Sequence, residues 1–519
     1  MTRQTPGRAA ACILAAAFLL VACTSSPRTA QNQVVYGIAT QPVRLNPITQ
    51  PDIVSRWAIE LVFDGLVEVD EHLELVPALA TSWETSADGL SLTFHLRPGV
   101  LWHDGQPFSA ADVKFTYETI RDPATAPTVA KSDYASIAQI ETPDEATVIF
   151  RLAYPDASLP SKLVTGIAPR HLLEGQDLAT TIFNQQPVGT GPFRFESWQP
   201  DQQLTFVANP DYYSGRPRLG RIVWKFVPDS SSLSLQLLSG EVDGAAVSAP
   251  QDLRRFQAAP DLTVYPVLGG NVQISLQLDN PLFQDRRVRQ ALAHALDKGA
   301  MVQKLMGGAA TIATSDILPG TWAYDPEVNT YPYDPDLARS LLAQAGWLPG
   351  SDGVLIRDGR PFHFALLVDA GDDLHRQIAL FIQQQWAKVG VEAEIVFLER
   401  NTLIFDRLLP GQFESALLQS SVRADPDLSR RFHSRAIEAG QNFLHYSNPE
   451  VDALLDRGLA VQERSERQAI YFEVQRLMAE DLPQIPLFHP QVGYVFRADL
   501  TGIRPSSMSP FWNVEAWGY

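Results

Sequence analysis

The sequence predicts an α/β protein with two large lobes, and two observations lead to this prediction. The chain has 519 residues, and the 497 that remain after a leader of 22 exceed what one hydrophobic core usually holds. Strands and helices also alternate along the second half of the chain, which is the order of parallel strands joined by helices.

The alternation is clearest between residues 334 and 397. Asp334-Pro335 opens a helix with apolar residues at helical spacing, and Gly346 closes it. A strand is expected over 362–368, a helix over 374–389 with a glycine at its end, and a further strand over 391–397. This order predicts parallel strand pairing in this half of the chain.

Two other segments give local predictions. Alternating apolar residues predict a half-buried strand over 90–96, and Ser109 with Asp112 three residues later predicts the capped start of a helix. Val288, Leu292 and Leu296 sit at helical spacing and predict a helical region that Gly307-Gly308 ends.

The first 22 residues have the composition of a secretory signal peptide. Arg3 and Arg8 precede an apolar run from Ala9 to Ala22, which is shorter than the about 20 apolar residues that span a bilayer. The run ends in Leu20-Val21-Ala22-Cys23, which resembles a bacterial lipobox. This resemblance implies that a diacylglyceryl group is attached to Cys23, which would anchor the chain without a transmembrane helix. The alternative is a plain signal peptide with an incidental cysteine.

The residues after Cys23 are polar and cannot bury a core, so they predict a flexible tether. We therefore expect a signal peptide over 1–22 and a lipidated cysteine with its tether over 23–33. Cys12, the second of the two cysteines, lies in the segment to be removed. The mature body would then contain no disulfide, no cysteine nucleophile and no thiolate metal site.

Charge and motifs exclude several classes of function. The net charge of −18 argues against a nucleic acid or an anionic membrane face as a partner. The histidines show no pair at the spacing of a helical zinc motif, and no Gly-x-Ser-x-Gly nucleophile elbow is present. No pair of carboxylates stands out either, so we expect no enzyme activity, no metal and no cofactor.

Seven stretches carry a family resemblance over nearly the whole mature chain. They are the segment from Leu61 to Pro123, PVGTGPF at 187–193, NPDYYSGRP at 209–217, LLSGEVDGA at 237–245, DRRVRQALAHALDK at 285–298, YDPDLARSLLAQAGW at 333–347 and QQWAKVGVEAEIV at 384–396. In this order they resemble the extracytoplasmic solute-binding proteins of peptide, dipeptide and nickel ABC importers, solute-binding protein family 5.

The resemblance implies a two-lobe α/β fold of the periplasmic-binding-protein type (type II, large variant), which closes around its ligand by hinge motion. Lobe I would comprise 34–268 plus 490–519, with an extra subdomain over about 48–188, and lobe II would comprise 269–489. Two chain crossings, near 267–273 and 486–493, would form the hinge.

The resemblance also implies a function. The chain would bind a peptide or other small polar solute and deliver it to the permease subunits and ATPases of an ABC importer. It would do so as a monomer anchored to the outer face of the cytoplasmic membrane, in the periplasmic space or at the cell surface. The alternatives are a lipoprotein of the same fold that presents its ligand to a sensor or acts as a chaperone-like factor, and a surface hydrolase.

The family pattern implies three ligand-contacting segments, although a packing or solvent role is the alternative for each. They contain Thr40 and Gln41 after the first strand, Gly270 and Asn271 at the first crossing, and Gln419, Ser420, Ser421, Arg423 and Asp425 around an acidic-Pro step.

Two positions depart from dipeptide-binding relatives. Those relatives hold the ligand's ammonium group with an acidic residue where an ungapped match gives Val422, next to Arg423. They hold the ligand's carboxylate with an arginine where the match gives Asp369. Because a buried ion without its partner is strongly disfavoured, we expect the ligand to be something other than a free dipeptide. A longer or blocked peptide, or another polar metabolite that is anionic at Arg423, fits this pattern.

Overall fold

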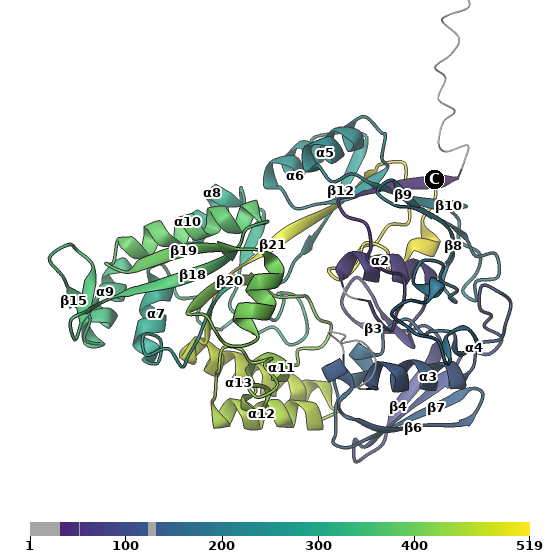
Figure 1. The fold of residues 1–519 in the computed structure, drawn as a ribbon, viewed down its shortest axis with the longest axis horizontal. Helices are drawn as coiled ribbons and strands as arrows, with labels where there is room; N and C mark the ends of the chain where they lie inside the picture. Colours follow the sequence, from purple (N-terminus) through teal and green to yellow (C-terminus); the bar gives the residue numbers. More distant parts are fainter. Residues whose placement is uncertain (1–31, 51, 123–130) are drawn as a thin grey trace, which may run out of the picture.

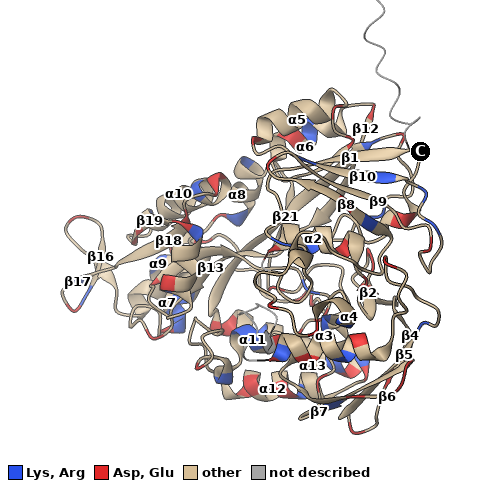
Figure 2. Ribbon diagram, turned by 45° about the vertical axis from the view of Figure 1, so that its right-hand side comes forward, with Lys and Arg blue, Asp and Glu red and all other residues tan. Residues whose placement is uncertain are grey.

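The computed structural model describes residues 32–50, 52–122 and 131–519. The predicted signal peptide, the predicted lipidation site Cys23 and most of the tether lie outside the described residues. The described chain forms two lobes, and strand β21 (Gln484–Arg497) runs from one to the other (Figure 1). No described helix is both long and apolar enough to cross a membrane. Acidic and basic residues are spread over the helices and loops of both lobes (Figure 2).

The first lobe is built on a mixed sheet in the order β21-β11-β1-β10-β9-β8, with β12 also paired to β21. The strands are β1 (Gln33–Ile38), β8 (Phe193–Gln199), β9 (Gln203–Ala208), β10 (Arg221–Phe226), β11 (Gly244–Val247) and β12 (Leu262–Leu268). Strand β1 pairs in parallel with β10 and β11, and its apolar side chains are buried on both faces of the sheet. Tyr36 points into the main core, and Val35 points into the cluster beneath α5 (Ser230–Leu238) and α6 (Pro250–Gln257).

A second layer of the first lobe contains a four-stranded antiparallel sheet in the order β4-β5-β7-β6. Its strands are β4 (Ala80–Thr85), β5 (Ser91–Leu96), β6 (Ile137–Asp144) and β7 (Thr147–Leu152). Helix α3 (Ala110–Arg121) packs on this sheet, and the predicted cap is confirmed because Ser109 N donates to Asp112 Oδ2 at 2.9 Å. The other elements of this layer are α2 (Ile53–Val62), β2 (Val67–Val69), β3 (Leu75–Pro77), η2 (Lys131–Tyr134), η3 (Leu159–Lys162), α4 (Arg170–Leu173) and η4 (Ile182–Asn184).

The second lobe is built on a sheet in the order β19-β18-β20-β13-β21, with β14 also paired to β21. Its strands are β13 (Val272–Leu276), β14 (Ala310–Ile312), β18 (His363–Asp369), β19 (Glu392–Leu398) and β20 (Ser415–Gln419), and a small hairpin sheet adds β15 (Leu348–Pro349), β16 (Leu355–Arg357) and β17 (Arg360–Pro361). The helices are α7 (Arg286–His294), α8 (Lys298–Leu305), α9 (Pro335–Gln344), α10 (Asp373–Ala387), α11 (Ser429–Phe432), α12 (Pro449–Ala460) and α13 (Arg464–Asp481), with a π-helix at η5 (Thr402–Leu408) and a 3-10 turn at η6 (Ser434–Ala436).

The predicted strand–helix–strand unit of this lobe is confirmed. Strands β18 and β19 pair in parallel, and α10 connects them. The helix ends before Gly390, whose φ of 80° suits glycine because other residues are strained in this region. The predicted helical region from Val288 to Gly307-Gly308 is confirmed, but it contains two helices. Helix α7 stops at His294, and Asp297 accepts a hydrogen bond from Ala300 N at 2.8 Å to begin α8.

A buried carboxyl group in the first lobe gives a prediction about pH. Asp64 lies just after α2, where it accepts hydrogen bonds from Thr190 Oγ1 at 2.8 Å and from the Tyr212 hydroxyl at 3.1 Å. Burial raises its pKa to about 6, against these hydrogen bonds and with added repulsion from Glu515. The folded chain therefore binds this proton more tightly than the unfolded chain. The resulting stabilisation is present below about pH 4 and is lost as the pH rises through about 6, a change of about 3 kcal/mol.

We expect Asp64→Asn to reduce this pH dependence, because asparagine keeps the hydrogen-bonding partners but cannot ionise. Melting temperatures at about pH 4 and about pH 8 would differ less for this variant than for the parent chain. Asp211→Asn, which changes an exposed carboxylate, is the control. Equal pH dependence in Asp64→Asn and in the parent chain would contradict the prediction.

Candidate ligand-binding site

The two lobes are joined where β12 leads into β13 and where β21 passes between the sheets. Residues 262–268 of β12 pair with the end of β21, whereas β13 pairs with its start. Between them, Gly269 N donates to Pro490 O at 2.8 Å and Ser420 N donates to Asn271 O at 2.9 Å. The side-chain amide of Gln419 donates to Gly270 O at 3.3 Å. Four of the predicted ligand-contacting residues, Gly270, Asn271, Gln419 and Ser420, are therefore in direct contact with one another.

Gly270 is required here by space rather than by backbone angle. A Cβ atom at this position would lie 1.7 Å from Ser420 O, so the two backbones could not approach as they do. The side chain of Asn271 is fully buried and donates to Asp316 Oδ1 at 3.1 Å. Arg431 and Gln484 also donate to Asp316, at 2.9 and 3.2 Å. The Asn271 Oδ1 atom has no hydrogen-bond partner among the described residues, so it can accept a bond from a ligand.

Apolar residues from both lobes meet beside this crossing. We call this group the apolar seam. It consists of Val69, Leu73, Leu75, Val164 and Met508 from the first lobe, Leu268 at the crossing, and Leu318, Val422 and Ala424 from the second lobe. Because residues from the two lobes cover each other here, these side chains would face the opening if the lobes separated.

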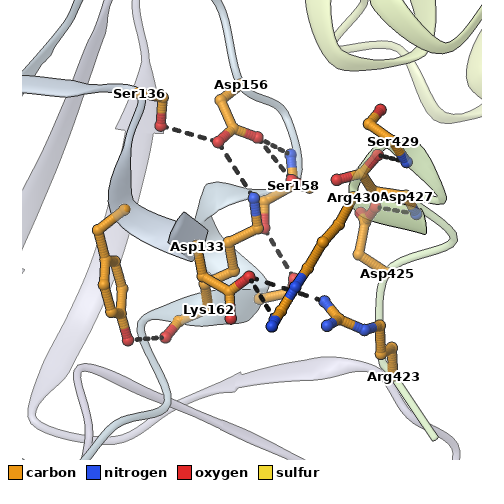
Figure 3. Close-up of polar contacts among 12 residues, drawn as sticks. Asp133, Ser136, Asp156, Ser158, Lys162, Arg423, Asp425, Asp427, Ser429 and Arg430 are labelled. Atoms are coloured by element: carbon orange, nitrogen blue, oxygen red, sulfur yellow. Dashed lines mark hydrogen bonds and ion pairs between the residues drawn. The ribbon is translucent and has the colours of Figure 1, made fainter. Parts of the chain in front are cut away.

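Ion pairs also connect the two lobes near the 420–425 segment (Figure 3). Asp133 of η2 lies between two arginines of the second lobe, with its Oδ1 atom 3.4 Å from Arg430 Nη1 and 4.0 Å from Arg423 Nη1. Lys162 lies nearby but pairs with Asp156 at 3.3 Å within its own lobe. The Arg423 side chain is 44% exposed, which makes it the more accessible of the two arginines.

Two further contacts tie the lobes together at this edge. Arg464 of α13 donates to Glu74 Oε2 at 3.0 Å, and Ala157 N donates to Leu459 O at 2.8 Å. Exposed ion pairs contribute little stability individually. The apolar seam and the backbone hydrogen bond therefore contribute most to the contact between the lobes.

The acidic residues singled out from the sequence are paired within the second lobe. Both carboxylate oxygens of Asp425 accept hydrogen bonds from Arg467 at 2.9 Å, in a pair that is almost completely buried. Asp369 accepts from Gly371 N at 2.9 Å and from Arg400 at 3.2 Å. These carboxylates are used to hold loops of the second lobe, so neither is a free counter-charge for a ligand.

The remaining predicted residues lie apart from this cluster or at its edge. Thr40 is exposed beyond the end of β1, and Gln41 bonds to Asp201 in the β8–β9 turn, with distances of 2.9 and 3.2 Å. Ser421 is exposed next to Ser420. The ligand-contacting role of all nine predicted residues stays a prediction.

Sequence reasoning missed the apolar seam and Asp133. Isolated valines and leucines such as Val69 and Leu318 look like ordinary core residues, and no pattern links positions so far apart in the chain. Asp133 likewise belongs to no recognisable sequence motif. The segment from Ser420 to Ala424 did point to this site from the sequence, because Val422, next to Arg423, stands where dipeptide-binding relatives have an acidic residue.

No group of three or more metal-ligating side chains among the described residues is close enough to hold a metal ion. A shallow hollow of about 930 Å³ lies within the second lobe, beside α10 and β19 and away from the crossing. Its lining includes His363, Gln383 and Glu394, and it does not touch the apolar seam. We therefore place the candidate site at the crossing and not in this hollow.

Comparisons with known proteins agree along most of the chain. A family model described as bacterial extracellular solute-binding proteins, family 5 Middle, matches residues 74–436. The oligopeptide-binding protein AppA of Bacillus subtilis is 30% identical over 497 residues, covering 93% of this chain and 91% of that protein. Its structure in complex with a nonapeptide matches with a TM-score of 0.82 and 29% identity, over 94% of this chain and 98% of that one. The crystal structure of NikZ from Campylobacter jejuni in complex with Ni(L-His) matches with a TM-score of 0.82 and 30% identity, over 94% and 100% of the two chains.

These matches confirm the two-lobe α/β fold and the family resemblance predicted from the sequence. The homologues are solute-binding proteins and not enzymes. The chain therefore belongs to the bacterial extracellular solute-binding proteins of family 5.

Proposed function

We propose that this protein captures a small solute between its lobes and delivers it to the permease and ATPases of an ABC importer. Relatives named for an oligopeptide and a relative bound to Ni(L-His) support a peptide-like or similarly sized ligand. The observation that carries the proposal is the crossing itself. Polar groups of Asn271, Gln419 and Ser420 lie there beside the apolar seam, where β21 and the 269–271 link carry the chain from one lobe to the other.

The proposed hinge follows from the same geometry. Residues 269–271 lie between β12 and β13, and residues near 489–492 lie where β21 changes partners. Lobe I would comprise 34–268 plus 490–519 and lobe II would comprise 269–489, with the four-stranded sheet and α3 inside the extra subdomain. Closure about such a hinge buries a ligand against both lobes.

Among the predicted ligand residues we propose direct contacts from Asn271, Gln419, Ser420, Ser421 and Arg423. Asn271 offers an acceptor, Ser420 a hydroxyl and Arg423 an accessible guanidinium group. Asp425 would act indirectly, by holding the segment that carries these residues.

Native mass spectrometry of the protein purified without unfolding tests the proposal. We expect a co-purifying small molecule that is lost on unfolding and refolding, and whose return reduces the radius of gyration measured by small-angle X-ray scattering. The proposal fails if no small molecule is retained and no fraction of a metabolite extract changes the scattering or the tryptophan fluorescence.

We also propose that Cys23 carries the lipid that anchors a monomeric protein to the outer face of the cytoplasmic membrane. The lipobox-like sequence before it supports this proposal. Cys23→Ser is expected to move the protein from the membrane fraction to the soluble fraction and to abolish labelling by a clickable fatty acid. Labelling that persists in Cys23→Ser would refute the anchor, and Cys12→Ser is the matched control.

A further inference from the structure

The apolar seam indicates which ligands this site can accept. Hydrophobic side chains from the two lobes and from the crossing form its walls. Val422 and Ala424 supply the wall of the second lobe, while Val164 and Met508 lie in the first. A ligand that enters between these walls must replace the contacts they make with each other, so it needs an apolar surface of its own.

The charged groups next to the seam are already paired. A ligand ammonium group in the seam would need an ionised carboxylate. Burial disfavours that form at Glu68, beside Val69, because it raises the pKa of this carboxyl group well above its usual value. Five other carboxylates near the seam are each engaged by a cation. The pairs are Asp133 with Arg430, Glu74 with Arg464, Asp156 with Lys162, Asp316 with Arg431, and Asp425 with Arg467. A cationic ligand would have to break one of these pairs or remain unpaired, and both are costly in a buried site.

Arg423 is different from the other cations of this group. Its Nη1 atom is 4.0 Å from Asp133 Oδ1, beyond hydrogen-bond distance, and Arg430 approaches the same oxygen more closely at 3.4 Å. A guanidinium group has five N–H donors, so Arg423 can bind a carboxylate while Arg430 keeps Asp133. Arg423 also lies directly between Val422 and Ala424 in the chain, so its backbone borders the apolar wall.

We propose that the ligand of this protein is an apolar molecule without an ammonium group, whose carboxylate pairs with Arg423. A peptide with a blocked amino end and a free carboxyl end belongs to this class. The proposal rests on the proposed function, since it assigns a ligand class to the same site.

Four forms of trileucine separate the contributions of the two end charges. They are the N-acetyl acid, the N-acetyl amide, the free-amine acid and the free-amine amide, with binding measured by calorimetry. We expect the N-acetyl acid to bind most tightly and the N-acetyl amide about tenfold more weakly, because the latter loses a charge-assisted hydrogen bond. The free-amine acid should bind about a hundredfold more weakly than the N-acetyl acid, because its ammonium group lacks a counter-charge. The free-amine amide loses both contributions and should bind about a thousandfold more weakly.

Two variants test the residues named. Arg423→Gln should remove the difference between the N-acetyl acid and the N-acetyl amide. Val422→Asp places a carboxylate in the seam and should make the free-amine amide bind better than the N-acetyl amide. Arg339→Gln, which removes an exposed arginine of α9, is the control and should alter none of the four affinities.

The outcomes separate this inference from the proposed function. If a free-amine form binds as tightly as the N-acetyl acid, or if Arg423→Gln leaves the preference for the acid intact, the ligand class is wrong and the binding function stands. If none of the four peptides binds, and the co-purified small molecule that closes the lobes carries an ammonium group or lacks a carboxylate, the ligand class is also wrong. If neither the peptides nor any co-purified molecule binds, both the ligand class and the proposed function fail.

Discussion

Arg467→Met is expected to lower the free energy of unfolding by about 3–5 kcal/mol. The guanidinium group of Arg467 donates to both oxygens of Asp425 at 2.9 Å, and its Nε donates to Gly458 O at 2.9 Å. Burial raises the pKa of Asp425, and Arg467 opposes that shift. Without Arg467, the Asp425 carboxylate would remain buried without its counter-ion, which is the most costly way to break such a pair.

The loss should be recovered when the carboxylate is removed as well. Asp425→Asn combined with Arg467→Met leaves no buried charge and keeps the acceptor for Asp427 N, which lies 3.0 Å from Asp425 Oδ1. Thermal unfolding followed by calorimetry compares the single and double variants. Arg476→Met on the same helix removes an exposed arginine and should leave the melting temperature unchanged. A single variant that is as stable as the double variant would show that the pair does not hold this segment.

Ligand affinity should fall together with stability in Arg467→Met. Asp425 follows Ala424 directly, so its pairing with α13 holds the segment that carries Val422 and Arg423 in place. Native mass spectrometry of the single variant should therefore detect less of the co-purifying molecule, and the double variant should regain part of it.

Gly270→Ala is expected to destabilise the crossing by about 1–3 kcal/mol, as overpacking does in a tightly packed site. The added Cβ would lie 1.7 Å from Ser420 O and 2.6 Å from the Ser420 carbonyl carbon. Because both are backbone atoms, β13 and the end of β20 must move apart, which strains the bond from Ser420 N to Asn271 O. We therefore expect reduced retention of the co-purifying ligand as well as a lower melting temperature.

The neighbouring glycine provides a matched control for this prediction. A Cβ at Gly269 would lie no closer than 3.2 Å to any atom, and the nearest is the movable side-chain amide of Gln419. Gly269→Ala should therefore change stability and ligand retention much less. Equal effects of the two substitutions would mean that the close approach to Ser420 is not what position 270 requires.

Much of the fold could be predicted from the sequence because it depends on local patterns. Alternating apolar residues gave β5, β18 and β19, and the caps at Ser109 and Asp334 marked the starts of α3 and α9. The division of the region from Val288 to Gly308 into α7 and α8 has a local cause too. Helical spacing continues through Leu296, but Asp297 caps a new helix, and periodicity alone cannot detect such a break.

The candidate site could be predicted only in part. The family pattern named Gly270, Asn271, Gln419 and Ser420, and the structure brings these residues into contact. The same pattern named Gln41 and Asp425, whose side chains bond to Asp201 and Arg467. A linear pattern gives positions along the chain, but it does not show which neighbour a side chain meets.

The sequence by itself determined the layered α/β elements, the family and the positions of the strands that cross between the lobes. Only the tertiary structure decided which charges are paired and which apolar residues face each other between the lobes. Asp133 and Arg430 are 297 residues apart, and the apolar seam draws on positions from Val69 to Met508. The physical reason is the distance along the chain over which each effect acts. Periodicity and capping act within a few residues, whereas ion pairing and burial depend on which distant segments the folded lobes bring together.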